Sequence, residues 1–312
     1  GSEMCIRDRI VLSRAFSVKH FCPIYAPFRR ILSKMTQEPA SLRRIIKKAQ
    51  KVDFLSSEGF LMTETAKAPV RCGLSGTALK YIACITMLID HIGASCIEAG
   101  ILLPALAAGA ASCGGIPVST LLAADRVLRY IGRLAFPIFC FLAVEGFLHT
   151  HDVKKYVRRL LLFGLLSEVP FDLAFFRTPF APQHQNVYWT LALGVLAMAG
   201  LKRFEKENGL PGWQGLVWAG GCAALALASN TDYHAIGVLI ICTLYLTRAD
   251  RKRQCLAGAL LFLFELTAPL AFVLVWFYNG QRGACSPLQK KAFYWFYPVH
   301  LLVLAGITNL ML

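Results

Sequence analysis

Apolar stretches of nearly bilayer-crossing length recur along this chain, and they limit its fold more than any other feature. A helix needs about 20 mostly apolar residues to cross the hydrocarbon core of a membrane. Only helices and closed barrels satisfy the backbone in lipid, and these runs lack the strict alternation of barrel strands. The sequence therefore predicts an all-α fold, a polytopic membrane helical bundle of eight or nine transmembrane helices. The eight apolar runs are residues 79–97, 130–148, 160–176, 187–201, 216–228, 236–247, 255–277 and 292–312.

The composition agrees with a membrane protein. Of the 312 residues, 56% are hydrophobic and 16% are charged, whereas about a quarter of the residues in a soluble domain are charged. The 11 cysteines are scattered, without a paired CxxC spacing. Packing between helices is therefore a better interpretation of the cysteines than a disulfide scaffold.

The run at 255–277 leaves the number of spans open. If it is one span, the loop that holds Arg282, Lys290 and Lys291 lies outside, against the rule that basic loops stay in the cytoplasm. If it breaks near residues 265–269 into two short helices, that loop returns inside and the total becomes nine.

Basic residues in alternate connections predict the orientation. The connections 149–159, 202–206 and 248–253 are basic, while the intervening loops 98–125, 177–185 and 229–233 together contain one Arg and no Lys. With a cytoplasmic N-terminus, this is the positive-inside pattern. We expect a multi-pass protein of a bacterial cytoplasmic (inner) membrane, whose first partner is the lipid bilayer.

A basic extension precedes the bundle, so the predicted domains are an extension at 1–73 and a transmembrane domain at 74–312. Residues 1–72 hold 14 of the 33 Lys and Arg and 6 of the 18 Asp and Glu. A cytoplasmic anchor explains this charge better than nucleic-acid binding does, and we expect no nucleic-acid partner. The extension is predicted to be disordered and lacks a signal-peptide core. Met35 and Met62 are candidate starts of the native chain.

Ionisable and polar side chains interrupt five of the predicted spans. A charge at the centre of a transmembrane helix costs a few kcal/mol, so each needs a partner, a cavity or a function. Asp90 and His91 lie about 16 Å from the inner end of the first span, at roughly 1.5 Å per residue. The predicted topology brings the whole set to the outer half of the bundle. Its members are Asp90, His91, Arg129, Arg133, Glu168, Asp172, Asn186, Thr190, Asp232 and Tyr233.

Two interpretations of this set are open. The first is helix-fastening ion pairs, for example Arg133 with Asp90 and Arg129 with Asp172. The second is a shared polar cavity, which we favour because two guanidiniums cannot neutralise four carboxylates. An imidazole in such a cavity suits proton transfer. The sequence shows no zinc-ligand spacing, GxSxG elbow or phosphate-binding glycine loop, so we expect no metal site.

Several motifs resemble the TraX family over residue 74 to the end of the chain. They are TMLIDHIG at 86–93, RYIGRLAFPIF at 129–139, VEGF at 144–147, SEVPFD at 167–172, QNV at 185–187, TDY at 231–233, YNG at 278–280 and YPVHL at 297–301. The resemblance implies an integral membrane protein. The namesake is associated with N-terminal acetylation of conjugative pilin, and the family is similar to multi-pass acyltransferases that use acetyl-CoA.

The resemblance and the polar set together predict a membrane acetyltransferase that moves an acetyl group from acetyl-CoA to a protein N-terminus or another amine or hydroxyl acceptor. A pilin or another acetyl acceptor is the expected partner. His91 is the candidate general base, or the carrier of an acetyl-imidazole. Asp90 cannot face its neighbour on one helix, so Asp172 or Asp232 is the better group to orient the ring. The predicted catalytic residues are His91, Asp90, Asp172 and Asp232.

The other members of the set are predicted to bind substrate or acyl donor. The two arginines could hold coenzyme phosphates, although they better suit fixing the carboxylates, and Asn186 or Tyr233 could donate to an oxyanion. The binding candidates are Arg129, Arg133, Glu168, Asn186, Thr190, Tyr233 and His300. The alternatives are a transporter or channel with an intramembrane proton relay, and a non-catalytic scaffold.

Overall fold

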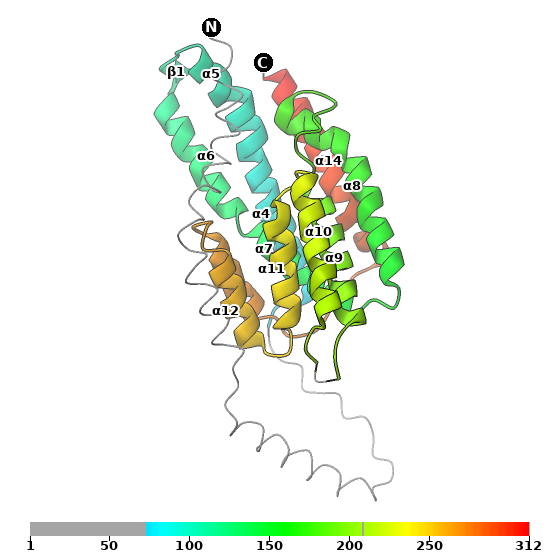
Figure 1. Ribbon diagram of the computed structural model, residues 1–312. Helices are drawn as coiled ribbons and strands as arrows, with labels where there is room; N and C mark the ends of the chain where they lie inside the picture. The colour runs from blue at the N-terminus through cyan, green and yellow to red at the C-terminus, as the bar shows by residue number, and fades with distance from the viewer. Residues whose placement is uncertain (1–72, 208, 312) are drawn as a thin grey trace, which may run out of the picture. The chain divides into compact units, whose positions relative to one another are not determined.

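The computed structural model describes residues 73–207 and 209–311, which belong to one compact unit. Apart from Gly73, the predicted extension lies outside the described residues, and so do both candidate starts. Within these described residues helices follow one another, with one short strand pair (Figure 1). The first half contains α4 (Gly76–His91), η1 (Ile92–Leu102), α5 (Leu103–Ala107), β1 (Ser112–Cys113), β2 (Ile116–Pro117), α6 (Val118–Gly132), α7 (Ala135–Leu148) and α8 (Val153–Phe176). The second contains α9 (Val187–Arg203), α10 (Trp213–Ala228), α11 (His234–Leu246), α12 (Arg251–Leu261), η2 (Ala268–Leu270), α13 (Ala271–Trp276) and α14 (Pro287–Leu310).

The first two helical arms are longer than expected. Helices α4, η1 and α5 run without interruption for 32 residues, and α6 with α7 covers 31 residues. The outer loop expected at 98–125 is therefore mostly helix. Alanine and leucine, which are abundant there, favour helix. The true turn is confined to residues 108–117, which include the β1–β2 pair, and Gly109, Gly114 and Gly115 adopt positive φ angles there.

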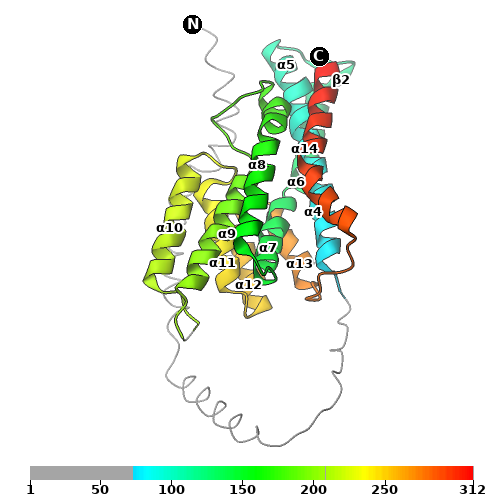
Figure 2. The ribbon, with the colours of Figure 1, turned by 90° about the vertical axis from the view of Figure 1, so that its right-hand side faces the viewer.

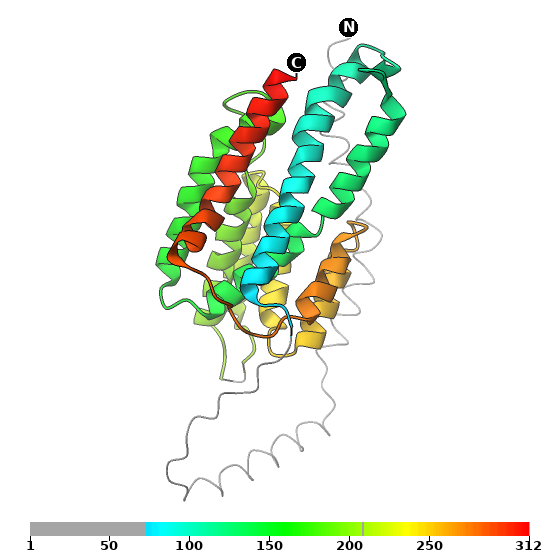
Figure 3. The ribbon, with the colours of Figure 1, turned by 180° about the vertical axis from the view of Figure 1, so that it is seen from behind.

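The segment 255–277 is two short helices rather than one span. Helix α12 has 11 residues and α13 has 6, and the chain reverses between them. The end of α13 is held beside the residues just before α4, because Leu74 N donates to Phe277 O at 2.8 Å and Asn279 N donates to Leu74 O at 3.0 Å. The loop that follows therefore lies beside the beginning of α4, as the broken-helix alternative predicted (Figure 3).

Three helices of the described part are long and apolar enough to cross a membrane. They are Gly76–Ala107, Val118–Leu148 and Pro287–Leu310, and α10 and α11 are shorter apolar helices. The membrane character of the chain is thus supported, but the predicted count of eight or nine full spans is not confirmed. Helix α11, with 13 residues, is about 20 Å long, whereas the hydrocarbon core is about 30 Å thick.

The connections of the bundle sort into two ends. At the end where α4 begins, Arg248 pairs with Glu205 at 2.9 Å and Arg251 lies 3.7 Å from a Glu145 oxygen. At the opposite end of the shorter helices, the loop before α9 pairs with the turn before α11 (Figure 2). The basic connections therefore share one end of the bundle, which is the predicted cytoplasmic end.

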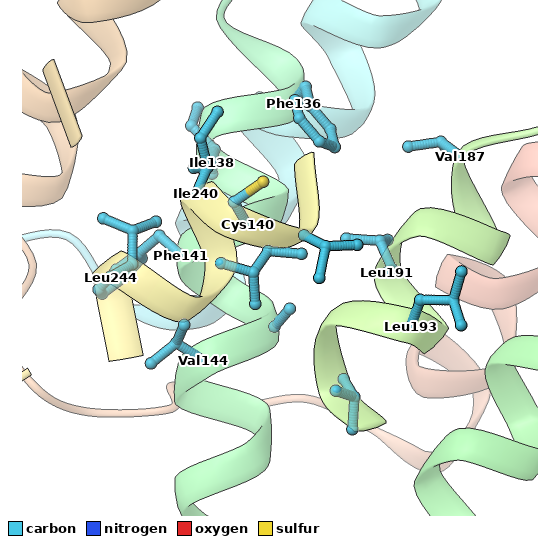
Figure 4. Close-up of a cluster of buried hydrophobic side chains, with 14 of the residues drawn as sticks. Phe136, Ile138, Cys140, Phe141, Val144, Val187, Leu191, Leu193, Ile240 and Leu244 are labelled. Atoms are coloured by element: carbon cyan, nitrogen blue, oxygen red, sulfur yellow. The ribbon is translucent and has the colours of Figure 1, made fainter. Parts of the chain in front are cut away.

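The apolar core lies between α7, α9 and α11. Ile138 and Phe141 of α7 and Ile240 and Leu244 of α11 are completely buried, and α9 packs beside them (Figure 4). Gly194 allows the close approach of α9 and α11, since a Cβ there would lie 2.4 Å from the Ile241 side chain. This packing fixes the heights at which α9 and α11 begin, where several of the polar residues lie.

Candidate functional site

Asp90 lies in the middle of the first long arm and pairs with α6. Its Oδ2 is 2.6 Å from Nη1 of Arg129, which also donates to the Asp90 carbonyl at 3.3 Å. The two side chains are only 16% and 15% exposed. Gly132 permits this approach, because a Cβ at that position would lie 2.1 Å from the Asp90 Cβ. The pair fastens α4 to α6.

Arg133 contacts a different carboxylate. Its Nη1 lies 3.0 Å from Oε1 of Glu265, in the turn between α12 and α13. The hydroxyl of Tyr233 donates to the same oxygen at 3.2 Å, and its ring stacks on Phe136. Tyr233 has a φ of 61°, a left-handed conformation that is strained for a bulky residue. The turn of the short helical pair is thus tied to both α6 and α11.

His91 follows Asp90 but contacts α14. Its Nδ1 lies 2.7 Å from Nε2 of His300, and the two rings are nearly parallel. Nδ1 of His300 lies 2.7 Å from the backbone carbonyl oxygen of Phe296. The rings of Phe175 and Tyr297 flank His91 edge-on. Two imidazoles therefore share one hydrogen bond within an aromatic surround.

The segment directly after this histidine, η1, is a π-helix. π-Helical turns are rare in proteins, and those that occur often lie at functional sites. Small residues bring η1 close to both of its neighbours, since a Cβ at Gly93 would lie 3.3 Å from Leu128 and one at Gly100 would lie 3.0 Å from Thr308. Ser95 Oγ and Thr308 Oγ1 are 3.1 Å apart. The first arm is thus held against α6 and α14 at the level of the two histidines and beyond it.

The polar residues at the start of α9 connect three elements. The Asn186 amide donates to the Glu168 carboxylate and, at 2.8 Å, to the Gly164 carbonyl of α8. Trp189 Nε1 donates to the same Glu168 oxygen at 3.1 Å. Thr190 donates from its hydroxyl to a backbone carbonyl in the turn before α11. The predicted four-residue spacing therefore joins α9 to α8 and to that turn.

Asp172 is buried at the end of this polar region, with 2% of its surface exposed. Its Oδ2 accepts from the Ala181 N–H at 2.8 Å, which closes the loop after α8. Its Oδ1 is buried without a hydrogen-bond partner in the described part of the chain, and so are Oδ1 of Asp90 and Oε1 of Glu168. Buried acceptors are normally satisfied, so these oxygens favour an added donor group.

Asp232 lies in the turn before α11, where its backbone carbonyl accepts from the Thr190 hydroxyl. It directly precedes Tyr233, which contacts Glu265. The residues predicted from five spans, with His300, therefore take part in contacts that join α4 to α6 and α14, and α9 to α8 and the turn before α11. The roles predicted for them stay predictions.

The model of the family described as TraX protein matches residues 75–308. The chain belongs to the TraX family. It is also 33% identical, over 213 residues, to the "Probable fimbrial assembly protein FimC, serogroup H1" of Dichelobacter nodosus, in a match that covers 57% of this chain and 82% of the relative. No solved structure matches the chain. The resemblance inferred from the motifs is confirmed.

The ion pairs of this TraX-family chain differ from the examples weighed from its sequence. Arg129 pairs with Asp90 rather than Asp172, and Arg133 pairs with Glu265 rather than Asp90. Glu265 was not among the predicted site residues. Its signal was its position at the expected break of an apolar run, where a carboxylate must find a partner.

The site does not fit coenzyme phosphates at the two arginines. Each guanidinium already has a carboxylate within 3.0 Å, so neither offers an unneutralised charge to a phosphate. The two predicted oxyanion donors are likewise engaged, Tyr233 with Glu265 and Asn186 with Glu168. Among the described residues, no group of three or more His, Cys, Asp and Glu side chains is arranged to hold a metal ion.

A second polar cluster of this TraX-family chain lies at the end where α4 begins. The hydroxyl of Tyr278 donates to Glu145 at 3.1 Å. The Arg251 guanidinium lies over the rings of Phe141 and Tyr278, at 4.7 and 5.1 Å from their centroids. Burial raises the pKa of Tyr278, and the Glu145 charge adds to that rise. The cluster attaches the end of α13 to α7.

Proposed function

We propose that this TraX-family protein is a membrane acetyltransferase that moves an acetyl group from acetyl-CoA to the N-terminus of a pilus subunit, or to another amine or hydroxyl acceptor. The relative named as a probable fimbrial assembly protein supports the pilus connection. The observation that carries the proposal is the contact between His91 and His300, because it prepares one imidazole to accept a proton.

The hydrogen bonds of His91 and His300 determine which imidazole nitrogen can accept the proton. A carbonyl oxygen only accepts, so Nδ1 of His300 must donate to Phe296 O. In a neutral His300 the other nitrogen, Nε2, is then an acceptor, and Nδ1 of His91 donates to it. A neutral His91 therefore carries its proton on Nδ1 and its basic lone pair on Nε2.

The reaction balances with this tautomer. The acceptor nitrogen or oxygen attacks the thioester carbonyl carbon, forming the new C–N or C–O bond, and His91 Nε2 takes the acceptor's proton. The C–S bond breaks, and the thiolate of coenzyme A leaves and takes up the proton. His300 supports the imidazolium that forms, because it accepts the hydrogen bond from Nδ1.

Buried carboxylate oxygens in the polar set favour an amine acceptor. Asp90, Glu168 and Asp172 each have a buried oxygen that lacks a hydrogen-bond donor in the described part of the chain. An amine or ammonium group supplies N–H donors and positive charge. The alternative acceptor, a hydroxyl, supplies one donor only.

The test is incubation of membranes that contain the full chain with labelled acetyl-CoA, followed by identification of the labelled product. We expect His91→Ala to lower the transfer rate at least 100-fold, because a positioned general base contributes about 10²–10⁴ in rate. The matched control is His151→Ala, which removes an exposed imidazole before α8 and should leave transfer unchanged. Full activity in His91→Ala would refute the assignment.

The same groups favour a second candidate, a proton-conducting transporter. Paired imidazoles and buried carboxylates are the parts of intramembrane proton relays. Proteoliposomes that contain the chain should show no proton flux without acyl donor if the protein is an acetyltransferase. Flux that is lost in His91→Ala, together with absent acetyl transfer, would support the transporter instead.

A further inference from the structure

Three cations, Lys80, Arg282 and Lys290, lie where α4 and α14 begin. Lys80 of α4 is partly buried, and its Nζ lies 5.7 Å from the centroid of the Phe293 ring on α14. Arg282 belongs to the loop before α14 and Lys290 to the beginning of α14, and both segments lie against the start of α4. Among the described residues, none of the three forms an ion pair with a carboxylate.

Local backbone structure holds this cluster in place. The carbonyl of Arg282 accepts from both N and Oγ1 of Thr77, at 2.9 Å each, so the loop before α14 lies on the start of α4. Gln289 Nε2 donates to the hydroxyl of Tyr81 at 3.2 Å across the same boundary. Neither α4 nor α14 has an acidic residue in its first turn. Helix starts favour anions, so the positive charge there is unbalanced.

The cluster and the histidines lie on one continuous seam. Lys80, Cys84, Met87 and His91 fall at i, i+4, i+7 and i+11, which is one face of α4. On α14, Lys290, Phe293, Tyr297 and His300 follow the same kind of spacing. The two faces meet at both levels, because Lys80 contacts Phe293 and His91 contacts Tyr297 and His300. Eleven residues of helix separate the levels by about 16 Å.

We propose that Lys80, Arg282 and Lys290 form a binding site for phosphate groups, and that these are the phosphates of the acyl donor. The inference rests on the proposed acetyltransferase function. The two levels are about as far apart as an extended pantetheine arm is long, so a donor held by its phosphates at the cations can place its thioester at the level of His91. The alternative source of the same chemistry is the phosphate of a lipid headgroup.

Binding of coenzyme A to the full chain in phosphatidylcholine nanodiscs tests the site without requiring acetyl transfer. We expect Lys80→Gln to weaken binding about tenfold, since a charge-assisted hydrogen bond to phosphate is lost. Arg282→Gln and Lys290→Gln should weaken it less, because both side chains are exposed. Lys80→Arg should restore most of the affinity. Pantetheine, which lacks phosphate, should bind all variants equally.

The matched control is Lys155→Gln, which removes an exposed positive charge from the same end of the bundle. It should leave coenzyme A affinity unchanged. Equal affinity of Lys80→Gln and the unmodified chain, with both eluting as folded protein, would overturn the proposal. So would loss of tightly bound phosphatidylglycerol in the three variants without any binding of coenzyme A, because the phosphates would then belong to lipid.

The outcomes separate this site from the proposed function. Phosphate-dependent binding of coenzyme A that follows the variants, without transfer to any acceptor, supports the site and rejects the acetyltransferase. Acetyl transfer whose KM for acetyl-CoA is the same in all three variants supports the acetyltransferase and rejects the site.

Discussion

Asp90 and His91 are consecutive residues of α4 that contact different helices. Asp90 is ion-paired with Arg129 of α6, and its Cβ lies against Gly132. His91 shares a hydrogen bond with His300 of α14. A salt bridge between buried groups fixes two helices but leaves little charge to offer a substrate, whereas a neutral imidazole pair keeps a basic nitrogen.

Two kinds of contact therefore lie at one level of the bundle: the arginine side, which contains Asp90 and Arg129, and the histidine side, which contains His91 and His300. Substitutions on the arginine side should mainly lower the free energy of unfolding. Substitutions on the histidine side should mainly lower the rate of acetyl transfer. The arginine side also includes Arg133 and Glu265, which attach the turn between α12 and α13 to α6.

The largest stability effect is expected for Asp90→Ala, at about 3–5 kcal/mol of unfolding free energy, because it leaves Arg129 buried without its carboxylate. Unfolding of the detergent-solubilised protein by SDS measures the loss. The double variant Asp90→Leu/Arg129→Met should recover most of the stability, since replacing both members of a buried pair with apolar residues is often neutral. Continued instability of the double variant would mean that Asp90 does more than pair.

The sequence predicted the faces of the helices better than their partners. The four-residue spacing of Asn186 and Thr190 marked the polar start of α9, where the two side chains contact α8 and the turn before α11, and the break near Glu265 was one of two alternatives. The partner of Arg133 could not be predicted, because helical periodicity shows which side of a helix is polar but not which helix packs there. Glu265 reaches Arg133 only because the chain reverses after α12.

The contact between His91 and His300 also depends on the chain reversal after α12. His300 was predicted to bind substrate or acyl donor, and its depth relative to His91 depended on whether 255–277 was one span or two. The reversal at α12 and α13 determines the direction in which α14 runs. The tautomer of His300 depends further on its hydrogen bond to the Phe296 carbonyl, which sequence spacing does not reveal.

The second prediction concerns His300 and the histidine side. His300→Leu should lower the acetyl-transfer rate about 100-fold, because the His91 tautomer and imidazolium lose their partner. His300→Gln should retain part of the rate, since its amide oxygen can accept from Nδ1 of His91. Both variants should elute and melt like the unmodified protein. Equal rates for Leu and Gln would show that His300 does not position His91 by a hydrogen bond.

The third prediction concerns the close packing of Gly132 against Asp90. Gly132→Ala should destabilise the protein by about 1–3 kcal/mol, as overpacking does, because its Cβ would overlap Asp90. Thermal unfolding in detergent measures the change. Gly220→Ala in α10 is the control, since no atom lies within 4 Å of the added Cβ, and there alanine should be neutral or favourable in a helix. Equal destabilisation by both would point to a general intolerance of alanine.

The smallest effect tests the polar cluster at the far end of α7. Tyr278→Phe removes the hydrogen bond to Glu145 and should cost about 1 kcal/mol at neutral pH. Tyr81→Phe is the control, because the Tyr81 side chain is exposed and should change stability by less than about 0.5 kcal/mol.

The pH dependence sharpens this last test. Burial raises the pKa of Tyr278 in the folded protein, so the folded state holds the phenolic proton more tightly than the unfolded state. The stabilisation is therefore complete below the ordinary tyrosine pKa of about 10 and declines as the pH rises above it. Stability measured between pH 8 and 11 should fall less steeply in Tyr278→Phe than in the unmodified protein. Parallel curves would show that Tyr278 does not retain its proton through this contact.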